Sequence, residues 1–367
     1  MLDETKLALF SPNARTFLTP IYGYLEGVSS AVVTEARNGA YELEVICWPA
    51  AVTSGLNAPL PQPNMIIVAK PNPIDDPQPF RIYNSRMDIN GRLVIRARHI
   101  SYDLSWIVYT GSPPGSYTVA GIMGALTNLT GFNFSTDATG NVRWGFDVPV
   151  TVRALMGGVE GSLLDVIGGE WRFDGKQCRL LTDRASHVYH VRYGANMTDL
   201  DRLLSSEESY NSGFGYWHHE GEPVVTSGRV DVSSWILDAA GTQSDRTAWV
   251  TNRTKIYDLS DQYDTAPTQA TLQAKVRSLL TAENAAAVKS MLTVSAIDNP
   301  GVFGQDWSQI QLCDYAVIHH PQIGEATAKI TRTKYDVLRR MYTEVAIGAP
   351  RKTLPKRLAE LERRASL

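Results

Sequence analysis

The chain has 367 residues, enough for two to four compact domains. Its hydrophobic content of 43% and its charged content of 20% are those of an ordinary folded protein. The formal net charge of -3, with both signs mixed, argues against a strongly basic DNA-binding surface. The three cysteines, Cys47, Cys178 and Cys313, lack metal-ligand spacing, so we expect free core thiols in a protein made in a reducing compartment.

The N-terminal segment MLDETKLALF has acidic residues where a signal peptide carries basic ones. No apolar run in the sequence reaches membrane-spanning length. We therefore expect neither a leader peptide nor a membrane partner.

The first hundred residues are predicted to form antiparallel strands joined by tight turns. A short strand is expected over residues 7–10. Two hairpins follow, turning at Asn38-Gly39 and at Asn90-Gly91. At Asn90-Gly91 we expect a two-residue primed turn, because these residue types tolerate the positive φ that it requires. Apolar and polar side chains alternate along their arms, which predicts a sheet with one buried and one solvated face. The residues predicted to face inward are Tyr41, Leu43, Val45, Cys47, Leu93, Ile95 and Ala97.

The stretch between the hairpins, residues 57–79, is rich in proline. Residues 65–68 are apolar and predict a short buried strand. Proline cannot donate a ladder hydrogen bond, so the rest is expected to be loop or sheet edge. The prolines concerned are Pro71, Pro73, Pro77 and Pro79.

After Leu104 the pattern becomes mixed helix and strand. The predicted elements are a break at 111–115, a helix over 119–129, a short helix over 162–167 and a hairpin over 171–181. Thr118 is placed to cap the first helix, and Gly168-Gly169 to end the second. Beyond residue 186 we expect strands over 187–193, 246–257, 292–297, 309–318 and 326–347, a loop with an edge strand over 205–228, and a helix with Leu272, Val276, Leu279 and Leu280 on its apolar face.

The sequence contains no motif typical of a catalytic site, such as GxSxG, HExxH or a Walker A loop. The adjacent pairs His218-His219 and His319-His320 would point to opposite faces of a strand, so neither pair is expected to chelate a metal. No local motif marks a cysteine nucleophile.

Three carboxylates, Asp258, Asp261 and Asp264, are spaced three residues apart. They lack the glycine and terminal glutamate of a calcium-binding loop, so an acidic cluster at a helix N-terminus is the favoured interpretation. We therefore expect no catalytic, cofactor-binding or metal site.

Five arginines lie along the second hairpin: Arg81, Arg86, Arg92, Arg96 and Arg98. No stacking aromatic residues are interleaved among them, so a solvated or subunit-facing surface is favoured over nucleic-acid binding. Together with the lack of a catalytic motif, this favours a structural or binding protein over an enzyme.

Five segments, in this order, carry a family pattern: NGAYELEVICWP, PQPFRIYNSRMDINGRLVIRARHISYDL, SLLDVIGGEWRFDG, VRYGANMTDLDR and YAVIHHPQIGEATAKITRTKYDVLRRMYTEVAIGAP. They resemble the tail-associated structural proteins of siphophages and prophages. These are baseplate hub proteins, whose longer members end in a tail lysin or endopeptidase. The last segment resembles the family's closing strands through Lys334, Tyr335, Asp336, Leu338, Arg340, Val345 and Gly348. The family's Leu-Gly-Asp-Thr-Val is replaced by residues 312–316, LCDYA, and we expect no wall-degrading extension in this chain.

The resemblance implies an α+β, β-rich fold with two tube-like antiparallel β-barrel domains and two smaller α+β domains. The expected division is 1–109 for the first tube-like domain, 110–182 for a small α+β domain, 183–245 with 305–349 for the second tube-like domain, 246–304 for a helical insertion and 350–367 for a C-terminal helix.

The same resemblance implies a non-enzymatic homotrimer in the tail tip or baseplate of the virion, made in the host cytoplasm. Two tube-like domains in each of three chains would adapt a sixfold tail tube to a threefold tip. The implied partners are the distal tail protein, the tape measure protein and tail fibre or receptor-binding tip proteins. Phage DNA would pass through the channel without specific binding, which suits the mildly acidic chain.

Two alternatives stay open. One is a cell-wall-degrading tail lysin with peptidase activity. The other is a receptor- or saccharide-binding module that uses Tyr210, Phe214, Tyr216 and Trp217.

At the C-terminus, Leu354, Leu358 and Leu361 form an a/d-like apolar seam. This seam predicts a subunit or partner contact. A frayed tail is the simpler alternative, because an isolated helix this short is marginal.

Overall fold

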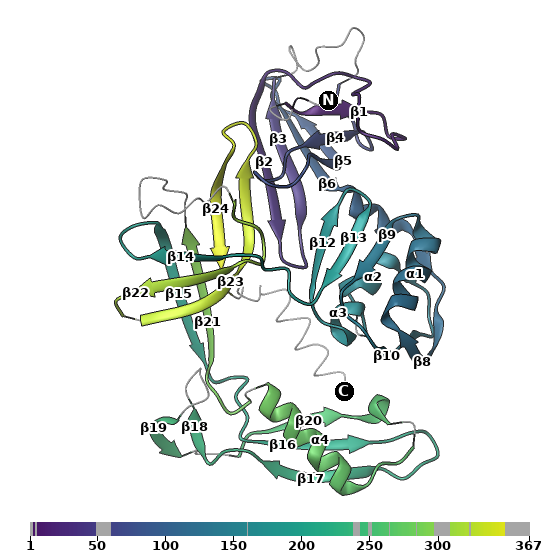
Figure 1. The fold of residues 1–367 in the computed structure, drawn as a ribbon, viewed down its shortest axis with the longest axis vertical. Coiled ribbons are helices and arrows are strands. Elements are labelled where there is room, and N and C mark those ends of the chain that lie inside the picture. The colour runs from purple at the N-terminus through teal and green to yellow at the C-terminus, as the bar shows by residue number, and fades with distance from the viewer. Residues whose placement is uncertain are drawn as a thin grey trace. The chain divides into compact units, whose positions relative to one another are not determined.

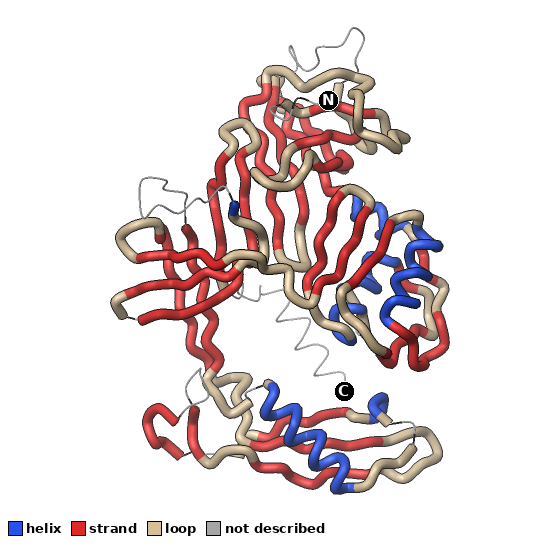
Figure 2. Tube along the Cα trace, in the orientation of Figure 1, coloured by secondary structure: helices blue, strands red, loops and turns tan. Residues whose placement is uncertain are grey.

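The computed structural model describes residues 3, 6–48, 60–159, 161–237, 243–248, 252–263, 265–283, 285–296, 309–322 and 324–348. The chain divides into two compact units, the first comprising residues 1–200 with 293–350 and the second centred on 201–292. Strands dominate, with a few helices beside them (Figures 1 and 2), so the predicted β-rich α+β class is confirmed. Among the described residues, no helix is long and apolar enough to span a bilayer.

The first unit begins with a set of six strands, called here the first strand set. They are β1 (Ala8–Phe10), β2 (Val28–Ala36), β3 (Tyr41–Cys47), β4 (Ile66–Ala69), β5 (Gln78–Met87) and β6 (Leu93–His99). Their order in the sheet is β1-β4-β5-β6-β3-β2. The seven side chains predicted to face inward from β3 and β6 are all buried, which confirms the alternation read from the sequence.

The second strand set is assembled from the later part of the chain. It contains β14 (Val188–Arg192), β15 (Met197–Ser205), β21 (Lys289–Ala296), β22 (Tyr315–His320), β23 (Gly324–Asp336) and β24 (Met341–Ile347). The pairings give the order β14-β22-β23-β24-β21-β15, which repeats that of the first set strand for strand. One difference is that β14 runs parallel to β22, whereas β1 runs antiparallel to β4.

Backbone details repeat along with the strand order. A non-glycine residue with positive φ lies two positions before each of the strands β4 and β22. These residues are Asn64, with φ of 75°, and Cys313, with φ of 76°. The amide of Asn64 donates to the carbonyl of Ile82 over 2.7 Å, and that of Cys313 donates to Ile330 over 2.9 Å. Ile82 of β5 is therefore equivalent to Ile330 of β23.

The equivalence continues to the ends of the two hairpins. A register shift follows Ile82 in the β5–β6 pairing, and one follows Ile330 in the β23–β24 pairing. At the tips, Asp88 and Asp336 each accept two backbone N–H groups with one carboxylate oxygen, which is how aspartate closes a turn. The two sets are thus repeats in structure, although the sequence shows no tandem repeat.

The two sets join edge to edge through β2 and β23. These strands are antiparallel, in a register that runs from Val32 opposite Asp336 to Ala36 opposite Arg332. The result is one sheet that continues from the first set into the second (Figure 1).

A small α+β region lies between the two strand sets in sequence. Its elements are η2 (Ile100–Trp106), β7 (Val108–Tyr109), β8 (Ser112–Thr118), α1 (Val119–Thr130), β9 (Asn133–Thr136), β10 (Asn141–Phe146), β11 (Val150–Thr151), α2 (Val152–Gly157), α3 (Leu163–Val166), β12 (Glu170–Asp174) and β13 (Gln177–Leu181). Thr118 caps α1 by accepting from the amide of Gly121, as predicted. Leu126, Leu155 and Trp171 are at the centre of its apolar core.

The second unit is a three-stranded sheet covered by a helix. It contains β16 (Ser212–Trp217), β17 (Val225–Asp231), β18 (Trp235–Leu237), β19 (Gln243–Ala248), β20 (Thr254–Asp258), η3 (Ser260–Gln262) and α4 (Gln269–Ala282). The predicted loop and edge strand over 205–228 is wrong, because β16 is the central strand of β17-β16-β20. Gly213 and Gly215 let α4 lie close, since an added Cβ would come within 2.8 Å and 2.5 Å of the methyl groups of Val276.

Three local predictions need correction. The second hairpin does not use a two-residue primed turn, because Asn90 has no positive φ and β5 and β6 are linked by residues 88–92. Pro79 is not in a loop but in β5, opposite Val68. The predicted break at 111–115 lies in β8, where prolines are tolerated because β8 pairs only with β10.

The expected four-domain division stays a prediction. Within the second unit, β16 pairs with β20 across the boundary expected at residue 246.

Candidate functional site

The most organised polar site in the first unit is a buried junction where the two strand sets meet the small α+β region. Its centre is an ion pair between Arg184, which follows β13, and Glu35 of β2. Arg184 Nη1 lies 2.9 Å from Glu35 Oε1, and the two side chains are 3% and 9% exposed. Burial by itself would lower the pKa of the guanidinium, but the attraction and hydrogen bond of Glu35, together with the neighbouring Cys313 and Asp75, outweigh it and raise that pKa.

A second carboxylate, Glu170 at the start of β12, connects all three parts. Its side chain is 1% exposed and lies 2.8 Å from Arg37 Nε and 2.7 Å from Lys329 Nζ. Its other oxygen accepts the backbone amide of Arg184 over 2.9 Å. Arg37 follows β2 and Lys329 belongs to β23, so one carboxylate holds residues from both strand sets.

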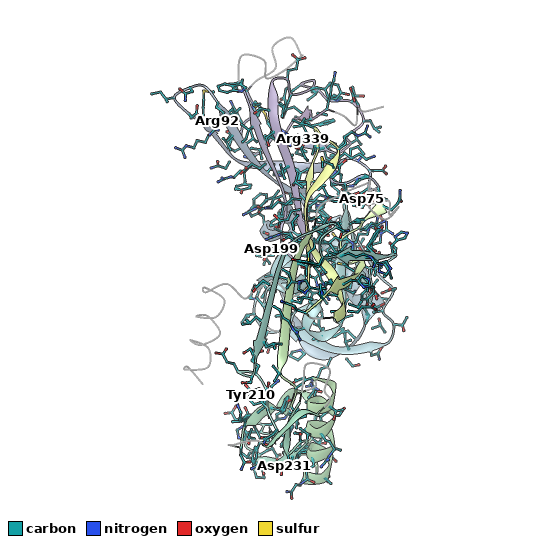
Figure 3. The ribbon with its side chains drawn as sticks, turned by 90° about the vertical axis from the view of Figure 1, so that its left-hand side faces the viewer. Asp75, Arg92, Asp199, Tyr210, Asp231 and Arg339 are labelled. Atoms are coloured by element: carbon teal, nitrogen blue, oxygen red, sulfur yellow. The ribbon has the colours of Figure 1, made fainter. Side chains whose placement is uncertain are left out.

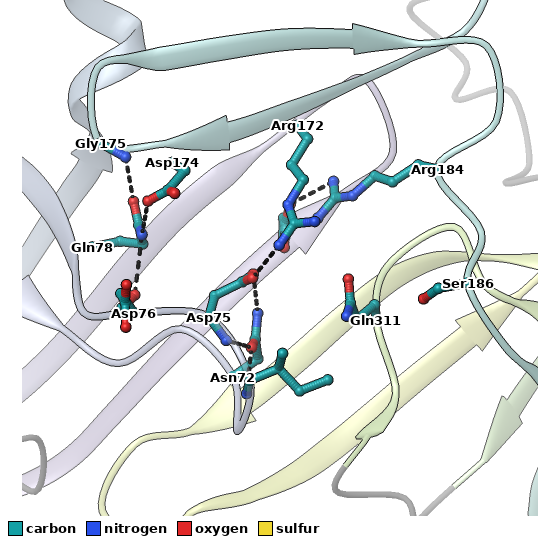
Figure 4. A network of polar contacts seen from close by, with 12 residues as sticks. Asn72, Asp75, Asp76, Gln78, Arg172, Asp174, Gly175, Arg184, Ser186 and Gln311 are labelled. Carbon is teal, nitrogen blue, oxygen red and sulfur yellow. Dashed lines mark hydrogen bonds and ion pairs between the residues drawn. The ribbon is translucent and has the colours of Figure 1, made fainter. Parts of the chain in front are cut away.

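The loop between β4 and β5 reaches the same junction (Figure 4). Asn72 shapes this loop by accepting the amides of Ile74 and Asp75. Asp75 then accepts a hydrogen bond of 2.7 Å from Arg172 of β12. Nearby, the side chain of Gln78 accepts the amide of Gly175 at the β12–β13 turn.

Two further residues close the junction. Asn38, predicted only as a turn residue, donates to the carbonyl of Gly169 and accepts the amide of Trp171 over 2.8 Å. Asp314 is fully buried and accepts the amides of Ser186 and His187. Each charged side chain named in this junction has at least one protein partner, although Arg184 Nε is buried without a hydrogen bond among the described residues, so the site is built to hold parts together.

The predicted arginine row is present but largely paired. Arg96 and Arg98 lie 3.0 Å from Glu44 and Glu42 on the neighbouring strand β3. Arg81 makes a two-pronged contact with Asp103, and Arg92 pairs with Asp88. The seam residues Leu354, Leu358 and Leu361 lie outside the described residues, so the predicted C-terminal contact stays a prediction.

The aspartate motif is only partly described, since Asp264 lies outside the described residues. No group of three potential metal ligands occurs in the described part of the chain. The expected acidic helix N-terminus is wrong, because α4 begins at Gln269 with Thr268 as its cap and has no acid in its first turn. Asp258 ends β20 instead, and it accepts hydrogen bonds from Ser260 and Tyr216.

One histidine contact was not predicted from the sequence. The ring of His190 on β14 is hydrogen-bonded to that of His319 on β22, with 2.9 Å between Nδ1 and Nε2. The parallel pairing of β14 with β22 brings the two residues together from 129 positions apart. No local pattern in the sequence signals such a pair.

Comparison with known proteins identifies the fold. No protein-family model matches the chain, and no curated protein matches its sequence. Among solved structures, prophage tail protein gp18 from Listeria monocytogenes aligns with a TM-score of 0.62 and 13% identity, over 98% of both chains. This chain has the fold of a prophage tail protein. The resemblance inferred from the five sequence segments is thereby confirmed for the fold.

Two other solved structures with the tail-protein fold agree. The 43 kDa tail protein of prophage MuSo2 from Shewanella oneidensis has a TM-score of 0.58 and 10% identity, covering 93% of this chain and 98% of its own. A tail protein from Neisseria meningitidis has a TM-score of 0.57 and 10% identity, covering 94% of this chain and 96% of its own.

In this tail-protein fold, the solvated face of the joined sheet is charged yet balanced. Its hollow is lined by Val32, Thr34, Glu42, Leu43, Glu44, Tyr83, Arg96, Lys334 and Thr343. Glu344 of β24 lies 2.7 Å from Lys334 and also binds Arg332. Partial burial favours the neutral acid, but the hydrogen bonds from Lys334 and Arg332 outweigh it and lower the pKa of Glu344. Carboxylates on neighbouring strands therefore neutralise the cations of this face.

The cysteines lie in the cores of the fold and are free, as predicted. Burial raises the pKa of Cys47 to about 11 and that of Cys178 and Cys313 to about 12. Because the thiolate is the reactive form, we expect the native thiols to react with an aromatic disulfide reagent at pH 8 about two orders of magnitude more slowly than a free thiol. The same assay in denaturant serves as the control, where all three should react. Rapid labelling of the native chain would contradict this prediction.

Proposed function

We propose that the protein is a structural hub of a phage-type tail, in which three chains form the baseplate ring at the distal end of the tail tube. The observation that carries this proposal is the repeat of six strands in one order, twice in a single chain. Three chains with two equivalent sets each supply six similar units, which suits a sixfold tube on one side and a threefold tip on the other. The likeness to prophage tail proteins over 98% of both chains supports the same assignment.

The polar face of the joined sheet suits the wall of a DNA exit channel. Proteins that hold DNA neutralise its phosphates with unpaired lysine and arginine side chains. Here Arg96, Arg98 and Lys334 lie against carboxylates on neighbouring strands, which leaves little net positive charge to retain DNA. The proposed partners are the distal tail protein, the tape measure protein and tail fibre or receptor-binding tip proteins, and no enzymatic activity is needed for this role.

A mass measurement tests the proposal. We expect size-exclusion chromatography with light scattering to give three times the 40.5 kDa mass of the chain, alone or together with the distal tail protein. Images of tails should then show the protein on the axis at the distal end. A chain that is monomeric under both conditions, or that lies off the axis, would contradict the proposal.

A further inference from the structure

The strand β5 has one edge that is only partly used. Its first half pairs with β4, from Ile66 opposite Arg81 to Ala69 opposite Gln78, and the last contact on that side is made by Ile82. In the described part of the chain, no strand pairs with the same edge beyond Ile82. Residues 83–87 therefore present unpaired backbone groups on the side away from β6, which is a ready template for another strand.

The equivalent edge of the second set is occupied. The first half of β23 pairs with β22, and its second half pairs with β2, from Arg332 opposite Ala36 to Asp336 opposite Val32. Since Ile82 corresponds to Ile330, residues 84–88, at the end of β5 and just past it, correspond to residues 332–336 of β23. Among the described strands, none takes on β5 the place that β2 takes on β23.

Burial of the equivalent side chains shows the same difference. In the second set, Thr331, Thr333, Tyr335 and Val337 are 8%, 5%, 2% and 2% exposed. In the first set, the corresponding Tyr83, Met87 and Ile89 are 43%, 47% and 101% exposed, and Ser85 is only half-buried. The first set thus exposes large apolar side chains at positions that the second set buries.

The strand that corresponds to β2 is β15, the last strand of the second set. In the described part of the chain, β15 pairs only with β21, and none of its nine residues is buried. Its Asp199 would bring a carboxylate toward the part of β5 that carries Arg86. Figure 3 shows Asp199 well away from Arg92, which lies at the tip of the β5–β6 hairpin, so this residue of β15 does not reach the tip within one chain.

We propose that β15 of a second copy of this chain pairs antiparallel with residues 84–88, at the end of β5 and just past it. This contact would repeat between chains the β2–β23 pairing that each chain makes within itself. It is a head-to-tail contact, which generates a closed ring or an open helix. That the ring closes with three chains rests on the proposed hub function, whereas the strand contact itself does not.

A single proline tests this contact. The amide of Asp88 donates to Arg92 on the β6 side, so by alternation the amide of Ser85 points to the free edge. Ser85→Pro removes that donor and leaves the β5–β6 hydrogen bonds, and Ser85→Ala keeps the donor as the matched control. We expect light scattering at about 10 mg/ml to show a multimer for the wild type and for Ser85→Ala, and at least a tenfold loss of association for Ser85→Pro at an unchanged melting temperature.

Cross-linking gives a second readout that leaves the backbone donor at position 85 of β5 in place. The native cysteines are buried, so a disulfide between Ser85→Cys and a cysteine placed in turn at positions 198–202 can be detected without removing them. We expect dimer bands on a non-reducing gel at alternate positions, as the two-residue period of a strand requires. A multimer that survives Ser85→Pro and forms no cross-link would overturn the strand contact and leave the hub proposal standing. If the wild type stays monomeric and the cysteine variants form no cross-link, the strand contact is overturned, and the mass measurement with the distal tail protein then decides the hub proposal.

Discussion

The substitution Glu35→Ala should lower the free energy of unfolding of the first unit by about 3–5 kcal/mol, because removal of one partner leaves the other charge buried and unpaired. Arg184 is 3% exposed and would keep its guanidinium in the junction without the carboxylate that lies 2.9 Å away. The partner cannot simply lose its proton, since arginine stays charged at all ordinary pH values. Urea unfolding followed by tryptophan fluorescence measures the change.

The matched control is Glu44→Ala, which removes a carboxylate from the solvated face of the same sheet. Glu44 pairs with Arg96, and both side chains are about half exposed. We expect a loss below about 1 kcal/mol, as for other surface ion pairs. The double variant Glu35→Met with Arg184→Met should recover most of the lost stability, since apolar residues of similar volume often replace a buried pair without cost. Equal losses for Glu35→Ala and Glu44→Ala would show that the junction does not stabilise the unit as argued.

The sequence could predict those parts of the fold that depend on local alternation. Tyr41, Leu43 and Val45 are buried as expected, because a strand exposes every second side chain to one face. β16 was missed for a physical reason. Gly213 and Gly215 are typical of loops, but here they create space for α4, and that need arises only once the helix is in place.

The buried junction could not be predicted from the sequence, and the repeat was expected only as what the family resemblance implies. Asn38 is a turn residue by local criteria, yet it is hydrogen-bonded to residues more than 130 positions away. The repeat is hidden because its matching points are backbone features, such as a positive φ at Asn64 in one set and at Cys313 in the other. A positive φ does not require the same residue type at the two positions. The two sets can therefore diverge in sequence while they retain their pairing.

The second large effect expected is a loss of stability in acid, and its source is a buried histidine at the end of β6. His99 is fully buried, its Nδ1 accepts the amide of Ser101, and its ring stacks on Tyr41 with 4.6 Å between centroids. Burial, assisted by the positive charge of Arg153, lowers the pKa of His99 to about 3. The folded protein therefore keeps this imidazole neutral, whereas the unfolded chain protonates it below a pKa of about 6.5.

The pKa of His99 is lower in the folded protein than in the unfolded chain. The contribution of His99 to stability is therefore fully present above the unfolded-state pKa and is lost as the pH falls below it. We expect the free energy of unfolding to fall by about 2 kcal/mol between pH 7 and pH 5 on account of His99. In this range carboxylates stay largely ionised, so histidine titration dominates the slope. His99→Gln should be less stable at pH 7 but should lose this part of the slope.

The control is His187→Gln, which removes a histidine whose side chain is 50% exposed in place of the buried one. The measurement is the urea midpoint of each variant at pH 5 and pH 7. An unchanged pH slope for His99→Gln would mean that His99 takes up a proton while folded. Burial of the neutral His99 ring between β3 and the small α+β region would then not account for the loss of stability in acid.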